Sequence, residues 1–149
     1  MVTPITLCGI AFRPKVKTPM QTKTQAMITR VAGVDGDARG KPGKRQVTVL
    51  SQEQWQLACN ELSTSLPWTT RRANLLIEGF EFDASMVGKQ IKIGQLILLI
   101  NGETDPCYKM DNQFQGLTKA LTPDWHGGVC CSVLADGRVS LGDAVQIVV

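Results

Sequence analysis

Among the five cysteines of this 149-residue chain, Cys107 has the surroundings most suited to chemistry. It follows Asp105 and Pro106 and stands two positions before Lys109. Because proline fixes its own φ and biases the preceding residue toward extended backbone, this turn should present the thiol at the rim of a structural element. A thiol at such a rim can meet a ligand or a metal, whereas most free cysteines only fill space in a core. The motif by itself leaves both roles open.

A glycine-rich loop over residues 33–46 combines four glycines with four basic side chains, which are Arg39, Lys41, Lys44 and Arg45. Freed backbone amides and cationic side chains are the groups that bind phosphate and other oxyanions. Asp37 is expected to hold this loop by accepting backbone amides. The loop lacks the Gly-Lys-Ser/Thr ending of a P-loop, so a nucleotide triphosphate site is not supported. The alternative interpretation is a mobile, solvated loop.

Two adjacent arginines, Arg71 and Arg72, stand at the entrance of a strand predicted to begin at Asn74. Adjacent strand residues face opposite sides, so at most one of the two should point into a given site. An arginine at a pocket mouth can hold a phosphate with two parallel hydrogen bonds. The alternative is a surface ion pair of little energetic weight.

The segment 124–131 contains the single histidine, His126, and the adjacent pair Cys130 and Cys131. No His or Cys stands at ligand spacing from His126, so it is a weak metal candidate and fits a turn residue better. The two cysteines fall on a predicted strand with side chains on opposite faces. One should therefore lie in the core and the other on the opposite surface.

The elements that must position these groups are mainly β-strands. Short apolar runs separated by glycine and proline turns predict strands over residues 5–12, 26–31, 46–50, 74–78, 90–93, 95–100, 128–134 and 144–149. Ser51 is a helix N-cap signal for a helix over residues 52–63, and a second short helix is expected over residues 116–121, before Pro123. We therefore expect a closed or partly closed β-barrel with a few short peripheral helices.

Composition predicts one globular domain over residues 1–149, with enough apolar residues (43%) to form a core without disulfides. The sequence has no secretory signal, no bilayer-length apolar run and no Cys-x-x-Cys spacing, so a cytoplasmic protein with reduced thiols is expected. The net charge of +3 is small. Because the basic residues are clustered, a local anion site is favoured over a general polyanion surface.

Several of these motifs together resemble the MOSC domain, the module named for the C-terminal part of molybdenum cofactor sulfurases. The matching segments are residues 33–37 (Gly-Val-x-Gly-Asp), 44–47 (Lys-Arg-Gln-Val), 68–79 (Trp-x-x-Arg-Arg-Ala-Asn-Leu-Leu-Ile-Glu-Gly), 106–111 (Pro-Cys-x-Lys-Met-Asp), 127–128 (Gly-Gly) and 141–143 (Leu-Gly-Asp). They occur in order over nearly the whole chain, and the resemblance is to the small stand-alone bacterial members. A β-barrel is the fold of that family.

The resemblance implies a site for the pyranopterin molybdenum cofactor, molybdopterin, with Cys107 as the ligand of the metal or of sulfur. Thiolate is a soft donor, and Lys109 and the arginines would favour its ionised form. The phosphate of the cofactor would be held by Lys44, Arg45, Arg71 and Arg72, and Asn74 and Asp37 also map onto the cofactor site. Pyridoxal phosphate, which larger relatives use, would belong to a separate partner. His126 stands where the family pattern has arginine, so the charge expected at that turn becomes titratable.

Two functions follow from the resemblance, and the residues alone leave a third. The first is an oxidoreductase that reduces N-hydroxylated small molecules with electrons from a redox donor protein. The second is a carrier of sulfur or of the cofactor, with Cys107 accepting a persulfide from a cysteine desulfurase-type donor. The third is an RNA-binding barrel, which is disfavoured because the eight aromatic residues are not interleaved with the basic clusters. No membrane partner is expected.

Overall fold

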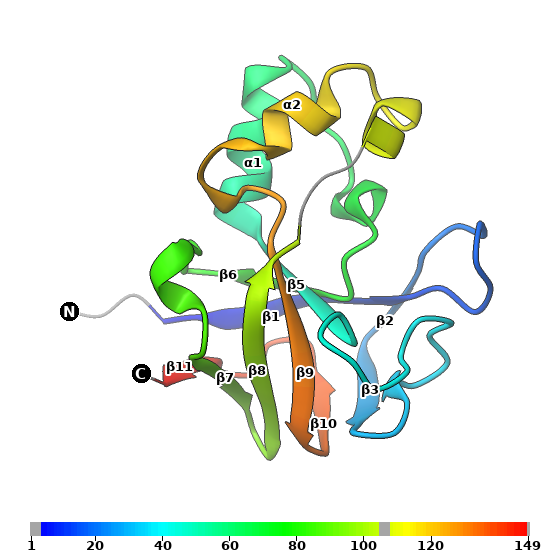
Figure 1. Cartoon of the computed structure of the whole chain (residues 1–149), viewed down its shortest axis with the longest axis vertical. Coiled ribbons are helices and arrows are strands. Elements are labelled where there is room, and N and C mark those ends of the chain that lie inside the picture. Colours follow the sequence, from blue (N-terminus) through cyan, green and yellow to red (C-terminus); the bar gives the residue numbers. More distant parts are fainter. Residues whose placement is uncertain (1–3, 105–107, 149) are drawn as a thin grey trace.

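The computed structural model describes residues 4–104 and 108–148, with the backbone alone at residues 108 and 109. Its larger sheet has eight strands in the order β11-β7-β8-β9-β5-β6-β1-β2 (Figure 1). In that order the strands are Gln146–Val148, Gln90–Ile93, Leu96–Glu103, Val129–Ala135, Val47–Ser51, Leu75–Glu78, Thr6–Phe12 and Gln21–Lys23. A smaller sheet has the order β10-β3-β4, with β10 at Gly137–Ser140, β3 at Gln25–Thr29 and β4 at Gly33–Val34.

The large sheet curls until its two ends meet. Residues 10–12 of β1 pair with β2. Residues 5–7, at the start of β1, pair with the segment that precedes β11. There the Leu7 N–H donates to the Asp143 carbonyl at 2.9 Å, and the Val145 N–H donates to the Ile5 carbonyl at 2.9 Å. These bonds remove much of the open edge that a curled sheet would otherwise expose.

Two short α-helices pack at one end of the curled sheet (Figure 1). Helix α1 (Gln52–Glu61) begins where Ser51 leaves β5, because the Ser51 hydroxyl accepts the Gln54 N–H at 3.3 Å. Helix α2 (Leu117–Leu121) ends before Pro123. The described residues also form four 3₁₀ helices, which are η1 at Trp68–Arg71, η2 at Ala84–Met86, η3 at Tyr108–Asn112 and η4 at Pro123–Trp125.

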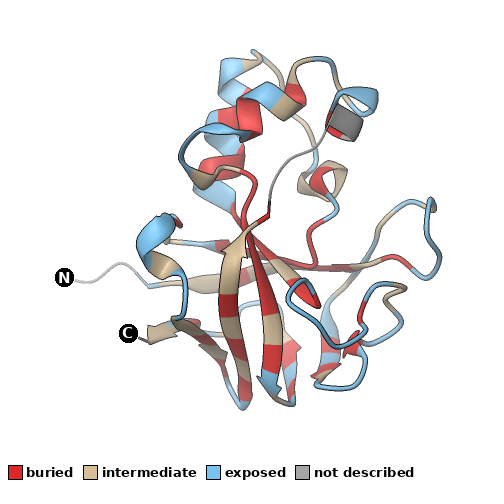
Figure 2. Ribbon diagram, in the orientation of Figure 1, coloured by how far each residue is buried: buried red, intermediate tan, exposed pale blue. Residues whose placement is uncertain are grey.

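The buried side chains form two clusters, one inside the curled sheet and one between the sheet and the helices (Figure 2). Leu96, Leu98 and Ile100 alternate along β8 and point into the first cluster, as the two-residue period of a strand requires. Trp55 and Leu117 belong to the second cluster. Because residues of β5 and β6 contribute to both clusters, these central strands are buried on both faces.

The expectation of a mainly β chain with a closed or partly closed barrel and few short helices is confirmed. The predicted strand over 26–31 extends too far, because β3 ends at Thr29, where its hydroxyl accepts the Ala32 N–H and starts a turn. Strands β2, β4 and β10 were not expected, since they are two to four residues long and largely polar or glycine-containing. No helix within the described residues is both long enough and apolar enough to span a bilayer.

Candidate functional site

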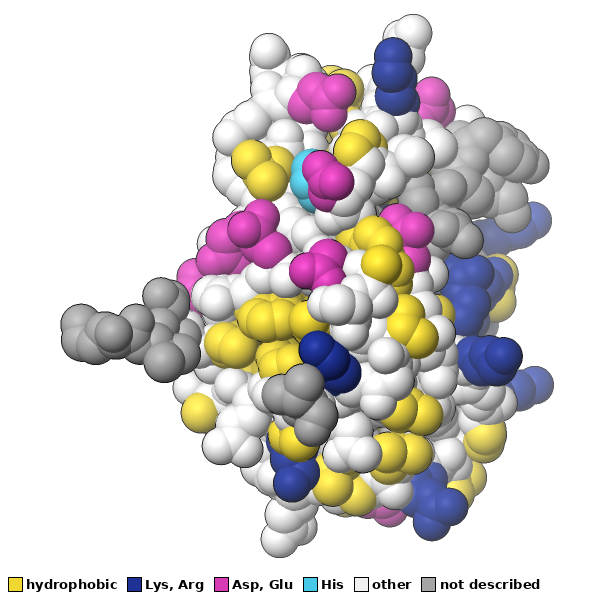
Figure 3. Space-filling model, turned by 60° about the vertical axis from the view of Figure 1, so that its left-hand side comes forward, with side chains coloured by type: hydrophobic (Ala, Val, Ile, Leu, Met, Phe, Trp, Pro, Cys, Tyr) yellow, Lys and Arg dark blue, Asp and Glu magenta, His cyan; other side chains and the backbone are white. Residues whose placement is uncertain are grey.

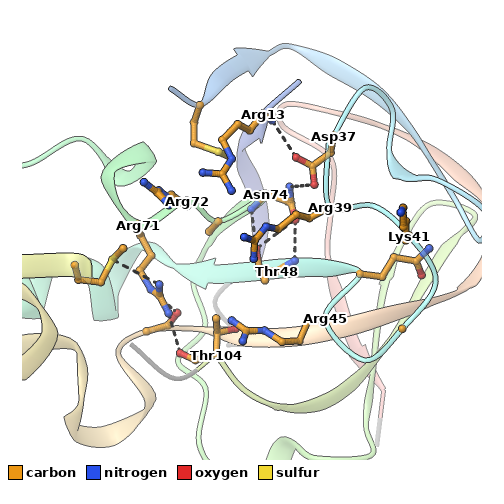
Figure 4. Close-up of a pocket in the computed structure, with 16 residues that line it drawn as sticks. Arg13, Asp37, Arg39, Lys41, Arg45, Thr48, Arg71, Arg72, Asn74 and Thr104 are labelled. Atoms are coloured by element: carbon orange, nitrogen blue, oxygen red, sulfur yellow. Dashed lines mark hydrogen bonds between the residues drawn. The ribbon is translucent and has the colours of Figure 1, made fainter. Parts of the chain in front are cut away.

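A polar pocket of about 460 Å³ lies where the ends of several strands meet the glycine-rich loop (Figure 4). Its lining combines the residue after β1, the loop, the η1–β6 turn and the residue after β8. The lining residues are Arg13, Met20, Asp37, Arg39, Lys41, Gly43, Arg45, Gln46, Thr48, Arg71, Arg72, Ala73, Asn74, Thr104, Met110 and Gly127. This volume falls within the range of small-molecule sites.

The charge of this lining is strongly positive. Its basic members are Arg13, Arg39, Lys41, Arg45, Arg71 and Arg72, and its one described acidic member is Asp37. Within residues 4–104 and 108–148, no ion pair with a carboxylate is formed by Arg13, Arg39, Arg45 or Arg72. On the face in Figure 3, Lys and Arg gather mainly along the right-hand edge, and most Asp and Glu lie in the upper half. The charge of the pocket lining is therefore complementary to an anion.

Arg13 is the most informative residue of the pocket. Its side chain is 5% exposed, and its Nη1 atom is buried with no hydrogen-bond partner among the described residues. Burial, followed by the charges of Arg72 and Arg39, lowers the pKa of Arg13, and Asp37 opposes that shift. A buried, unpaired guanidinium is costly, so this arrangement favours occupancy by a negatively charged ligand.

Asp37 and Asn74 form a hydrogen-bonded support behind Arg13. The Asp37 carboxylate accepts the Arg13 N–H at 2.9 Å, and the Arg13 carbonyl accepts the Ala38 N–H at 2.7 Å. Asn74 donates from Nδ2 to the Ala11 carbonyl at 3.2 Å and to Asp37 at 3.4 Å, and its Oδ1 accepts the Thr48 N–H at 3.0 Å. Asp37 was predicted to hold the glycine-rich loop, but the backbone amide that it accepts belongs to Arg13, just after β1.

Gln46 holds the glycine-rich loop in place. This buried amide donates from Nε2 to the carbonyls of Arg30 (2.8 Å) and Gly40 (3.0 Å), and its Oε1 accepts the Val133 N–H at 3.0 Å. One side chain therefore satisfies three backbone groups from three segments. The loop that carries Arg39, Lys41 and Arg45 is fastened to the sheet at its base.

Arg71 and Arg72 lie differently from the prediction. Arg71 ends the η1 helix and Arg72 has left-handed backbone (φ 66°), so strand alternation does not apply, and both residues line the pocket (Figure 4). Arg71 is buried and donates to the carbonyls of Gly127 (3.1 Å, from Nε) and Thr104 (2.8 Å, from Nη2). Arg71 therefore links the segment after β8, at Thr104, to the segment before β9, at Gly127, and both residues line the pocket.

Thr104 is the last described residue before the segment that contains Cys107. Its N–H donates to the Gly128 carbonyl at 2.9 Å, and its carbonyl accepts from Arg71. The side chain is 5% exposed, and its hydroxyl has no hydrogen-bond partner among the described residues. The backbone N–H and carbonyl of Thr104 are therefore both hydrogen-bonded, whereas its hydroxyl has no partner among the described residues.

The sequence-predicted site residues are brought together only in part. Asp37, Arg45, Arg71, Arg72 and Asn74 line the pocket, whereas Lys44 is exposed and outside the lining. Cys107 lies outside the described residues, and Lys109 lies in η3 with its side chain undescribed. His126 is also outside the lining, and its buried Nδ1 has no hydrogen-bond partner in the described part of the chain.

Three residues of the pocket lining, Arg13, Arg39 and Thr104, were not predicted individually as site residues. A usable signal existed for Arg13, because a charged residue directly follows the apolar run of the first strand and precedes Pro14. No comparable signal marks Thr104. Its role depends on contacts with Arg71 and Gly128, which are distant in sequence.

The described cysteines offer no alternative reactive site. Cys130 and Cys131 are both buried, so the prediction that one of the two lies on a surface is wrong. Cys8 is half-buried beside Gln52, and burial together with Glu78 and Glu53 raises its pKa to about 11. No group of three or more His, Cys, Asp or Glu suited to a metal ion occurs in the described part of the chain.

Comparison with known proteins identifies the family. The MOSC domain model matches residues 29–146, and no curated protein matches the chain. The fold is similar to the YuaD protein from Bacillus subtilis (TM-score 0.82, 18% identity, 96% of this chain and 95% of that one). It is also similar to YiiM from Escherichia coli (TM-score 0.72, 18% identity, 100% and 70%) and YiiM from Geobacillus stearothermophilus (0.76, 16%, 98% and 76%). With the curled sheet and the match over most of its length, the chain belongs to the MOSC domain family, which is associated with binding of the molybdenum cofactor.

Proposed function

We propose that the pocket binds the pyranopterin molybdenum cofactor through its phosphate and that the loaded protein is a reductase of N-hydroxylated compounds. The observation that carries the proposal is the buried, unpartnered Nη1 of Arg13 in a cavity lined by basic residues. A phosphate would supply the missing acceptor and the missing negative charge. The donor set therefore fits the charged part of the cofactor.

Each part of the pocket has a distinct task in this proposal. Arg13, with Arg39 and Arg72 close to it, would hold the phosphate, and Asp37 offsets part of the repulsion that these two arginines exert on Arg13. Met20, Met110 and Ala73 would supply the apolar contact that a flat ring system needs. Cys107, three positions after Thr104 in the sequence, would be the ligand of the metal. When bound, the cofactor supplies a molybdenum centre that takes up and releases electrons.

We favour a cofactor that stays bound over one that is passed to another protein, because hydrogen bonds from Arg71 hold the pocket wall at Thr104 and Gly127. Arg71 is buried, and its hydrogen bonds fix Thr104 and Gly127 against each other. In the proposed reaction an N-hydroxylated amine takes up two protons and two electrons and yields the amine and water. The electrons come from a separate donor protein, because the sequence carries no flavin, haem or iron–sulfur motif.

The experiment compares wild type and Cys107→Ala purified from a host that makes the cofactor. We expect molybdenum and pterin to accompany wild type and molybdenum to fall in the variant. Equal, negligible molybdenum in both proteins would refute cofactor binding. With loaded wild type, reduction of a hydroxylaminopurine by an artificial electron donor supports the reductase, and no turnover of the fully loaded protein contradicts it in favour of a carrier.

A further inference from the structure

Two buried polar atoms of the pocket have no partner among the described residues, and they belong to different walls. One is Nη1 of Arg13, after β1, and the other is the hydroxyl of Thr104, after β8. In Figure 4, Arg13 and Thr104 lie at opposite ends of the labelled group, with Asn74 and Thr48 between them. A ligand that satisfies both atoms must therefore extend across the pocket.

The size of the pocket also argues for an extended ligand. A volume of about 460 Å³ corresponds to roughly fifteen waters at ~30 Å³ each, far more than one phosphate group occupies. At one end of the pocket, Arg39 and Arg72 are close to Arg13, whose Nη1 has no partner among the described residues. At the other end, Arg71 already donates to the Thr104 carbonyl and contacts Met110, and Arg45 lies beside Thr104 (Figure 4). An anionic group fits the Arg13 end, and a group with a polar edge that can bond the hydroxyl fits the Thr104 end.

The position of Thr104 is fixed without help from its hydroxyl. Its N–H is bonded to Gly128 and its carbonyl to Arg71, at 2.9 and 2.8 Å. A hydroxyl with a structural role would make a bond inside the protein, as Ser51 does with the Phe80 carbonyl at 2.7 Å. The Thr104 hydroxyl makes none among the described residues, and most buried polar groups do have a partner.

We infer that Thr104 is a ligand-binding residue that hydrogen-bonds the heterocyclic end of the ligand, while Arg13 holds its phosphate end. This inference rests on the proposed function. It assigns the ligand class as a phosphorylated nitrogen heterocycle lying from Arg13 to Thr104, with a donor or acceptor on the ring edge that meets the hydroxyl.

The test uses three variants purified from a cofactor-producing host: Thr104→Val, Thr104→Ser and Arg13→Gln. The readouts are pterin retained per chain after repeated desalting, and the shift in thermal unfolding caused by inorganic phosphate. Thr104→Val should lower pterin retention about tenfold, as the loss of one hydrogen bond predicts, and leave the phosphate shift unchanged. Thr104→Ser should retain pterin as wild type does. Arg13→Gln should lose both pterin retention and the phosphate-induced shift in unfolding.

The unfolding temperature separates a binding role from a structural one. Valine is isosteric with threonine, so without cofactor Thr104→Val should unfold at the same temperature as wild type or higher, because an unpaired buried hydroxyl is removed. A lower unfolding temperature, or wild-type pterin retention in Thr104→Val, would overturn the inference while leaving the proposed function intact. Absence of pterin from wild type would instead overturn the proposed function.

Discussion

The carboxylate of Asp37 accepts the backbone N–H of Arg13 at 2.9 Å, and the same carboxylate is the one described acidic group in the pocket lining. One residue therefore fixes the backbone of the buried arginine and reduces the repulsion that Arg72 and Arg39 exert on it. Asp37 leaves Arg13 Nη1 without a partner. These contacts hold the Arg13 backbone in place in the absence of a ligand, which would lower the ordering cost of binding the proposed anion.

Inorganic phosphate should stabilise wild type against thermal unfolding and should not stabilise Arg13→Gln. A ligand that binds only the folded state at one hundred times its Kd contributes about 2.7 kcal/mol. Differential scanning fluorimetry over a phosphate series, at constant ionic strength set with chloride, measures the effect. Lys44→Gln, a basic residue outside the lining, should keep the wild-type shift. Equal shifts in Arg13→Gln and wild type would show that phosphate binds elsewhere.

Gln46→Ala should destabilise the fold by about 3 kcal/mol, because two carbonyls and one N–H lose their buried partner. The matched control is Gln56→Ala, an exposed glutamine whose side chain bonds Asn60 and no other described residue, and it should cost less than about 0.5 kcal/mol. Urea unfolding gives both values. Similar costs for the two variants would mean that the glycine-rich loop does not depend on Gln46.

Gly128→Ala should cost far more than Gly94→Ala, although both glycines have positive φ (91° and 60°). A methyl group at Gly128 would overlap the Val49 carbonyl, whereas the space around Gly94 is open. The shared backbone strain is of order 1–2 kcal/mol, so the excess measured for Gly128→Ala is the steric part. Chemical denaturation of the two variants tests this. If both lose the same stability, the close contact between Gly128 and β5 is wrong.

Alkylation of Cys8 should be slow at neutral pH and should rise about tenfold per pH unit through pH 10, because its pKa is raised to about 11. The fold favours the neutral thiol, so this contribution to stability is present below pH 9 and is lost as the pH rises toward 11. Iodoacetamide labelling followed by peptide mass spectrometry reports the rate at Cys8. A rate that levels off by pH 9 would contradict the raised pKa.

Sequence patterns predicted the long apolar strands and helix α1, because their signals are local. The run from Leu96 to Ile100 and the Ser51 cap need no distant partner to be recognised. Strands β2, β4 and β10 escaped prediction because they are short and depend on pairing: β10 exists through its register with β3, as in Val139 opposite Ala26. The closing bond between Leu7 and Asp143 depends on the curl of the whole sheet.

Lining residues could be predicted where basic residues are clustered in the sequence. They could not be predicted where the fold brings single, distant residues together. Arg45, Arg71 and Arg72 were predicted from their neighbours. Arg13 reaches the pocket from the end of β1, and Thr104 from the end of β8, so their shared environment follows from sheet order. Neither local composition nor spacing encodes a buried atom that lacks a partner.

The most direct test of the central claim is the amount of molybdenum and pterin bound per chain in wild type, Arg13→Gln and Lys44→Gln from a cofactor-producing host. Elemental analysis gives molybdenum, and fluorescence of the oxidised pterin gives the organic part. We predict that wild type and Lys44→Gln retain both components and that Arg13→Gln retains less than about a tenth of them, since a buried charged hydrogen bond is lost. Cofactor-free wild type, or Arg13→Gln loaded as fully as wild type, would contradict the account.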